Sequence, residues 1–154
     1  MKTKALLVIF GMILFASCGP KPGKSTASLT TEINSYVSQV DANKNLKQET
    51  IEGALTDTQG FKDIGNYKYT VYFDEQSNTL YKIKNVETTA ETLTEVYYFK
   101  DGDVVLIDTK SAGTASKMYV HKNKVISETK TEPSAQKLLL EKANRFLKAF
   151  QREH

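Results

Sequence analysis

The hydrophobic and polar positions of the chain change period twice. Between residues 29 and 43, apolar side chains recur at the spacing of one helix face, and they do so again after Pro133. Between these segments, from Tyr67 onward, apolar and polar residues alternate as on a strand with one buried face. The pattern predicts an N-terminal helix capped by Ser28 or Thr30, a run of strands, and a C-terminal helix. The apolar helix positions are Leu29, Ile33, Tyr36, Val37 and Val40 in the first helix and Leu139, Ala143, Phe146, Leu147 and Phe150 in the last.

The strand region contains three copies of one hairpin unit. Residues 98–105 (YFKDGDVV) and 119–126 (YVHKNKVI) align without a gap, and in each an aromatic strand end leads through a two-residue turn to an aliphatic return strand. The Asp-Gly pair at 101–102 is a strong signal for a type I′ turn, and the Lys-Asn pair at 122–123 is a weaker one. Residues 72–81 form a looser copy with a longer turn.

These elements predict an α+β domain. We expect an antiparallel β-meander of about six strands, in three hairpins, flanked by an N-terminal and a C-terminal helix of which one or both cover the sheet. Residues 103–108 (DVVLID) are apolar on both faces, which indicates an interior strand. Its expected faces are Val105 with Ile107 and Val104 with Leu106. The pattern of residues 46–66 fits either a short helix or a strand with a loop, and both alternatives stay open.

The N-terminal segment has a different character. Lys2 and Lys4 precede an unbroken run of apolar or small residues from Ala5 to Ala16, and Cys18, the only cysteine, follows directly after the next residue. A charged start, a short apolar run and small residues at its end make up a secretory signal peptide. The run is shorter than the roughly 20 residues of a membrane-spanning helix.

The end of this run (ASC, closing on Cys18) resembles the lipobox of bacterial lipoproteins. The resemblance implies that residues 1–17 are a signal peptide, removed by cleavage before Cys18, and that this cysteine carries lipid. Residues 18–27 are then the lipidated cysteine and a flexible linker, and residues 28–154 are a single domain. Gly19 stands where enteric lipoproteins retained at the inner membrane have Asp, which implies a lipid-anchored protein of the outer membrane, facing the periplasm or the cell surface.

A second resemblance rests on the hairpin around the Asp-Gly turn (VYYFKDGDVVLI, residues 96–107). Together with its two copies, this segment resembles small uncharacterised bacterial exported proteins with YYF-x-DG hairpins. The resemblance covers residues 67–130, and it implies a fold without an activity.

Charge and cysteine content narrow the classes of partner. The chain has 21 Lys and Arg against 18 Asp and Glu, and loss of Lys2 and Lys4 with the signal peptide leaves 19 against 18. A nearly neutral domain gives no basis for nucleic-acid binding. With one cysteine, no intramolecular disulfide can form, so the fold depends on its apolar core.

Residues of the types used in catalysis are present without a recognisable constellation. His121 and His154 are the only histidines, too few for a transition-metal site beside one lipidated cysteine. Asp101 and Asp103 flank a glycine, but the spacing of a calcium loop is missing. The Gly-Lys-Ser tripeptide at 23–25 lacks the strand that precedes a phosphate loop. We therefore expect no catalytic, cofactor or metal site, and the protein is not expected to be an enzyme.

Three tyrosines are the remaining candidates for a binding site. Tyr72, Tyr98 and Tyr119 fall at equivalent places in the three hairpins and are expected on one face of the sheet. They would then form either ordinary cross-strand packing or an exposed strip for a partner protein or glycan.

The leading hypothesis is a non-enzymatic, membrane-tethered binding or accessory module of the cell envelope. Its partners are the membrane, through the lipid on Cys18, and an envelope protein or glycan. The alternative is an inhibitor or protective factor against a lytic enzyme, acting through the loop expected at 109–117 (TKSAGTASK). A hydrolase with an unrecognised site is a weaker third hypothesis.

Overall fold

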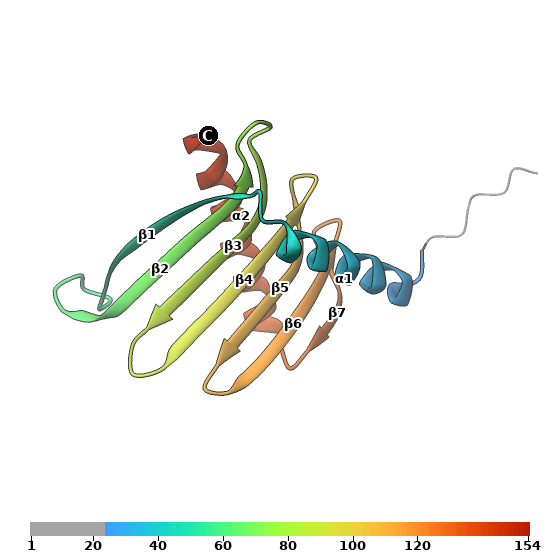
Figure 1. Cartoon of the computed structure of the whole chain (residues 1–154). Helices are drawn as coiled ribbons and strands as arrows, with labels where there is room; N and C mark the ends of the chain where they lie inside the picture. Colours follow the sequence, from blue (N-terminus) through green and yellow to red (C-terminus); the bar gives the residue numbers. More distant parts are fainter. Residues whose placement is uncertain (1–23) are drawn as a thin grey trace, which may run out of the picture.

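A computed structural model describes residues 24–154 as one antiparallel sheet with a helix at each end of the chain (Figure 1). The seven strands follow one another across the sheet in chain order, so the prediction of an α+β meander with two flanking helices is confirmed. The elements are α1 (Thr26–Ala42), β1 (Lys47–Thr56), β2 (Asp63–Asp74), β3 (Thr79–Thr88), β4 (Thr92–Lys100), β5 (Asp103–Ser111), β6 (Thr114–His121), β7 (Lys124–Thr129) and α2 (Pro133–Glu153).

The expected number of six strands is wrong, because the open segment 46–66 supplies a further strand. β1 pairs along its whole length with β2, which itself begins at Asp63 rather than at Tyr67. The alternating pattern is weak in β1 because only Gly53 and Leu55 are even half-buried. A strand at the edge of a sheet, exposed on both faces, carries little hydrophobic periodicity.

The predicted turns are confirmed by backbone geometry. Asp101 and Gly102 have φ of 53° and 81°, the positive values that a type I′ turn requires at both central residues. Lys122 and Asn123, at 51° and 60°, form the equivalent turn of the β6–β7 hairpin. The segment expected as a flexible loop at 109–117 is instead the end of β5, a tight turn and the start of β6.

A β-bulge at the same place in each hairpin copy changes the expected faces of the sheet. Tyr98 pairs with Leu106 and Phe99 pairs with Val104, so Val105 has no partner and is the extra residue of a bulge. Val104 and Ile107 therefore share one face, while Val105 and Leu106 share the other, contrary to strict alternation. The corresponding skipped residues of the other two copies are Tyr81 in β3 and Ile126 in β7.

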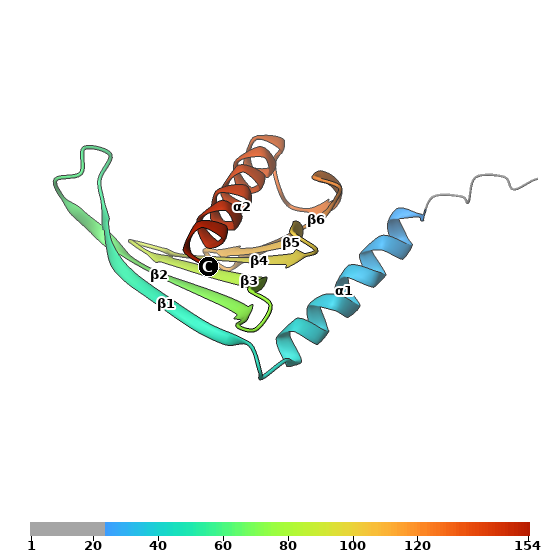
Figure 2. The ribbon, with the colours of Figure 1, turned by 90° about the horizontal axis from the view of Figure 1, so that it is seen from above.

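The two helices cover opposite faces of the sheet (Figure 2). On the α2 face, Phe73, Phe99 and Ile107 pack with Ala143 and Phe150 of α2. The smaller cluster on the other face contains α1, and its buried members are Ile33, Val40, Leu46, Tyr98 and Leu106. The sheet is thus the middle layer of three, and of the two alternatives left open, one covering helix or two, the structure has two.

Both helices begin close to the expected positions. The side chain of Ser25 caps α1 by accepting a hydrogen bond from the Ser28 N–H at 3.2 Å, so the helix starts earlier than a cap at Ser28 or Thr30 would allow. Pro133 occupies the first turn of α2, where its missing N–H costs no helix hydrogen bond.

Candidate functional site

The three tyrosines of the hairpin repeat lie on the face that α1 covers. Tyr72, Tyr98 and Tyr119 belong to one row across the sheet, but each is separated from the next by another strand, because Lys82 and Leu106 occupy the positions between them. The rings therefore do not stack on one another. They pack instead in the apolar cluster beneath α1.

Polar side chains of α1 accept hydrogen bonds from two of the three hydroxyl groups in this row. The Tyr98 hydroxyl donates to the Asp41 carboxylate at 3.0 Å, and the Tyr119 hydroxyl donates to the Asn34 side-chain oxygen at 3.0 Å. Burial, followed by the nearby Asp41 charge, raises the pKa of Tyr98. This arrangement favours the packing alternative over an exposed strip, because Tyr98 is buried and Tyr72 and Tyr119 are half-buried.

Lys82 joins the row to the C-terminal end of α1. Its ammonium lies 4.3 Å from the centroid of the Tyr72 ring, 5.9 Å from that of Tyr98, and 2.9 Å from the Asp41 carboxylate. A cation between two aromatic rings and a carboxylate is held by electrostatic attraction from three sides. This arrangement ties the C-terminal end of α1 to β3 and β4.

A buried ionic cluster lies between the sheet and α2, and the sequence analysis missed it. Lys142 of α2 contacts Glu95 at 2.6 Å and Glu87 at 2.9 Å, and the Asn85 amide donates to Glu87 at 2.8 Å and to Glu95 at 3.1 Å. The only signal in the sequence is two polar residues, Asn85 and Glu95, at positions where the alternation requires apolar side chains. They are directly opposite each other in the β3–β4 ladder.

The polar groups of this cluster bond to one another. Burial raises the pKa of Glu87, but hydrogen bonds from Lys142 and Asn85 outweigh it and leave this pKa below its usual value. Burial lowers the pKa of Lys142, but its contacts with Glu95 and then Glu87 outweigh it and leave this pKa raised. Asn85 and Glu95 are each only 4% exposed, so a substrate could reach them only if α2 moved away. We interpret the cluster as the polar attachment of α2 to the sheet.

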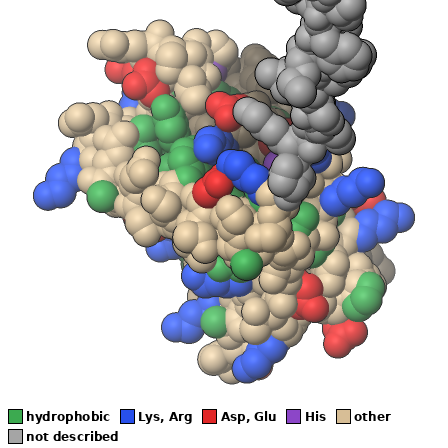
Figure 3. Space-filling view, turned by 90° about the vertical axis from the view of Figure 1, so that its right-hand side faces the viewer, with side chains coloured by type: hydrophobic (Ala, Val, Ile, Leu, Met, Phe, Trp, Pro, Cys, Tyr) green, Lys and Arg blue, Asp and Glu red, His purple; other side chains and the backbone are tan. Residues whose placement is uncertain are grey.

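A groove of about 600 Å³ opens between α1 and the turns of the β4–β5 and β6–β7 hairpins. Ile33 and Val120 are buried in its floor, and Lys24, Asp103 and His121 lie at its rim. His121 is exposed there. Basic, acidic and hydrophobic side chains are interspersed over this end of the molecule (Figure 3), so the groove shows no preference for one charge.

The most exposed apolar side chains belong to the β1–β2 hairpin. Of the four large hydrophobic side chains that are exposed within residues 24–154, three lie on it: Ile51, Phe61 and Ile64, at 52%, 89% and 48% exposure. The Asp57 carboxylate accepts the N–H groups of Gln59 and Phe61, both at 3.1 Å, and this organises the loop that presents the Phe61 ring to solvent. We take these three residues, Ile51, Phe61 and Ile64, as the candidate site and call them the hairpin patch.

Other candidates from the sequence are placed elsewhere or are not described. Cys18 lies outside the described residues. The His154 ring stacks on Phe150, with 4.3 Å between ring centroids, and faces Glu49 at 3.4 Å. Among residues 24–154, no three His, Cys, Asp or Glu side chains come together to hold a metal ion, and no helix is long and apolar enough to cross a membrane.

Comparison of the chain with protein families, with curated proteins and with solved structures finds no match.

Proposed function

We propose that the protein is a non-enzymatic, lipid-anchored binding module of the cell envelope, and that it binds its partner through the hairpin patch. The anchoring half of the proposal comes from the signal-like N-terminus and Cys18. The binding half comes from the β1–β2 hairpin, which carries three of the four large hydrophobic side chains exposed within residues 24–154, since exposed apolar surface is typical of interaction sites.

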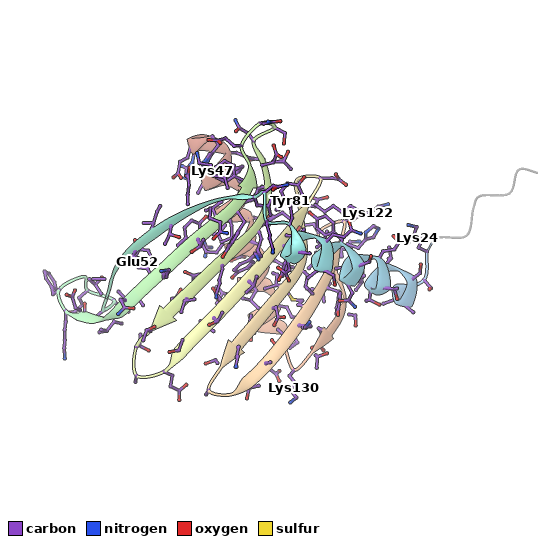
Figure 4. All side chains as sticks on the ribbon, in the orientation of Figure 1. Lys24, Lys47, Glu52, Tyr81, Lys122 and Lys130 are labelled. Carbon is purple, nitrogen blue, oxygen red and sulfur yellow. The ribbon has the colours of Figure 1, made fainter. Side chains whose placement is uncertain are left out.

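The observation that supports the proposal best is the distance between these two regions. Lys24, the first described residue, is at the start of α1, and the β1–β2 loop projects from the far side of the sheet (Figures 1 and 4). Figure 2 shows the same separation and shows that this loop curls toward the α2 side. Cys18 precedes Lys24 by six residues, a reach of at most about 20 Å for an extended chain. A lipid at Cys18 would thus hold the opposite end of the domain at the membrane and leave the patch free.

The side chains of the patch favour a protein partner. Ile51 and Ile64 are aliphatic, and Phe61 is a single aromatic ring at the tip of a loop. A glycan site would need polar groups converging around a stacking ring, whereas an apolar pocket on another envelope protein fits these three side chains. The alternative of an inhibitor acting through residues 109–117 receives no support, because that segment is built into the β5–β6 hairpin.

The test is site-specific photo-crosslinking in the bacterium that makes the protein. A photoreactive amino acid replaces Phe61 in the full chain, and a second strain carries it at Lys130, an exposed residue just after the end of β7 (Figure 4). We expect an adduct with a second envelope protein at position 61 and little at position 130, and we expect Cys18→Ser to weaken the adduct by releasing the domain.

Equal adducts at positions 61 and 130, or an adduct at position 61 that contains only a second copy of the chain, would contradict the proposal. If the adduct contains a lytic enzyme, the inhibitor alternative replaces that of an accessory module.

A further inference from the structure

The outer edge of β1 is unpaired. β1 is the first strand in the sheet order and pairs only with β2 among the described residues. It is ten residues long, contains no proline, and its first six residues are all exposed. Natural edge strands are usually short, charged, bulged or covered, because a free edge is a template for another strand. β1 has only Lys47 and two glutamates to discourage pairing.

The opposite edge of the sheet is better protected. β7 is six residues long, and Val125, Ile126 and Ser127 are half-buried. The chain folds back directly after it, where the Thr131 N–H donates to the Glu128 carboxylate at 3.0 Å. The two edges of one sheet therefore differ, and the difference points to β1 as the interaction surface.

We propose that two copies of this chain pair antiparallel along β1, with Ile51 opposite Ile51 of the second copy, so that the two sheets become one. An antiparallel contact between identical strands has a twofold axis, and the residue on that axis faces itself. An axis at Glu49 or Glu52 would set two carboxylates opposite each other, which destabilises a strand pair. An axis at Ile51 sets Glu49 opposite Gly53 and Thr50 opposite Glu52, so that no like charges are directly opposed.

The side chains around this axis suit the pairing. Ile51 has 52% of its surface exposed in the single chain, and its cross-strand neighbour in β2 is Tyr69. Two residues on, the Tyr67 ring lies over Gly53, so closely that a Cβ there would be 2.7 Å from a ring carbon. Pairing about Ile51 places the two isoleucines in contact and brings each toward the Tyr67 ring of the other copy. A second copy therefore covers Ile51, which β1 alone leaves in solvent, and leaves Phe61 and Ile64 of the hairpin patch, which lie outside β1, for the partner of the proposed function.

The geometry is compatible with two anchored chains. The twofold axis is perpendicular to the joined sheet, so it keeps both α1 helices on one face and both α2 helices on the other. In Figures 1 and 2, α1 lies at a distance from the free edge of β1, and only the connection from α1 enters the start of that strand. Both N-terminal segments then leave from the same face and can reach the same membrane.

Disulfide trapping tests the pairing and its register. The full chain carries Cys18→Ser, so that an introduced cysteine is its only one, and Ile51→Cys is compared with Glu49→Cys on the same face of the same strand. In the proposed register the two cysteines introduced at position 51 are directly opposite, with Cβ atoms about 5 Å apart. The two residues at position 49 are separated by four residue steps, about 13 Å, beyond the reach of a disulfide.

We expect mild oxidation to convert most of the Ile51→Cys protein to a covalent dimer and little of the Glu49→Cys protein. We also expect sedimentation of the Cys18→Ser chain to give the mass of two copies, and that of its Ile51→Lys variant to give the mass of one. Equal trapping at both positions, no trapping at position 51, or a monomeric Cys18→Ser chain would overturn the proposal. The chain used here has no anchor, so the result does not depend on lipidation of Cys18.

Discussion

At the scale of single residues, one charged side chain of each helix holds that helix to the sheet. Asp41 ties α1 to the sheet through Tyr98 and Lys82, and Lys142 ties α2 to it through Glu87 and Glu95. The Tyr97 hydroxyl, buried close to the second cluster, has no hydrogen-bond partner among the described residues. Removal of Lys142 is costly because the Glu95 carboxylate then stays buried without a cation.

We predict that Lys142→Met destabilises the domain by roughly 3 kcal/mol, since it leaves Glu95 buried without a cation. Lys148→Met is the matched control, because Lys148 is on the same helix and is exposed. Urea unfolding followed by circular dichroism measures both variants. A Lys142→Met midpoint equal to that of Lys148→Met would show that the cluster contributes nothing to stability.

We predict that acid destabilises the domain through Glu87. The pKa of this carboxyl is lowered in the folded state, so its ionised form contributes stability that is present above its unfolded pKa of about 4.3 and is lost as the pH falls through the folded value. Lys142 has a raised pKa, and its contribution is lost only when the pH rises above about 10. Glu87→Gln should therefore show a shallower loss of stability below about pH 4.3 than the unchanged chain.

The measurement for this second prediction is the urea midpoint as a function of pH, with Glu91→Gln in the exposed β3–β4 turn as the control. If the urea midpoints of Glu87→Gln and Glu91→Gln fall identically at acidic pH, protonation of Glu87 does not contribute to the loss of stability in acid.

At the scale of elements, the hairpin repeat organises the sheet. Each copy brings the same features: a tyrosine under α1, an apolar residue under α2, a turn, and a bulge in the return strand. The bulge sets two consecutive residues, such as Val105 and Leu106, on one face. Bulges also increase the local twist of a strand, and here they lie where α1 crosses the sheet.

The type I′ turns of the repeat lead to a prediction for Gly102. Its φ is 81°, a region that a β-branched residue tolerates poorly, so Gly102→Val should destabilise the domain by roughly 1 kcal/mol or more. Space is not the reason, since a Cβ at this position would meet nothing within 4 Å. Asp103→Val, next to it at the start of β5 and also exposed, is the control. If the two variants melt alike in urea, the cost of the backbone conformation has been overestimated.

Both helices, the three hairpins, their turns and the common face of the three tyrosines could be predicted, because all of these leave local patterns in the sequence. β1 could not, since an exposed edge strand has no buried face to set an alternation. Strict alternation misassigned Val105 because a bulge shifts the register without a local signal. The Lys142 cluster depends on where α2 crosses the sheet, and the hairpin patch depends on which side chains the fold leaves uncovered.

At the scale of the whole molecule, the two regions on which the proposal rests lie at opposite sides of the sheet. The α1 end of the sheet is joined to the N-terminal segment, and the β1–β2 hairpin with its apolar side chains projects from the other side (Figure 1). In the proposed dimer, the β1 strands of the two copies meet between the two domains.

The central claim is that Cys18 attaches this domain to a membrane, and the most direct measurement is the fraction of the full chain that stays in the membrane pellet after salt washing. The unchanged chain should stay in the pellet and incorporate labelled palmitate, because several buried acyl chains hold firmly. Ser17→Ala, which keeps a small residue before the cysteine, should behave in the same way. Cys18→Ser should remain unlabelled and move to the soluble fraction. A Cys18→Ser chain that stays in the washed pellet would contradict the account.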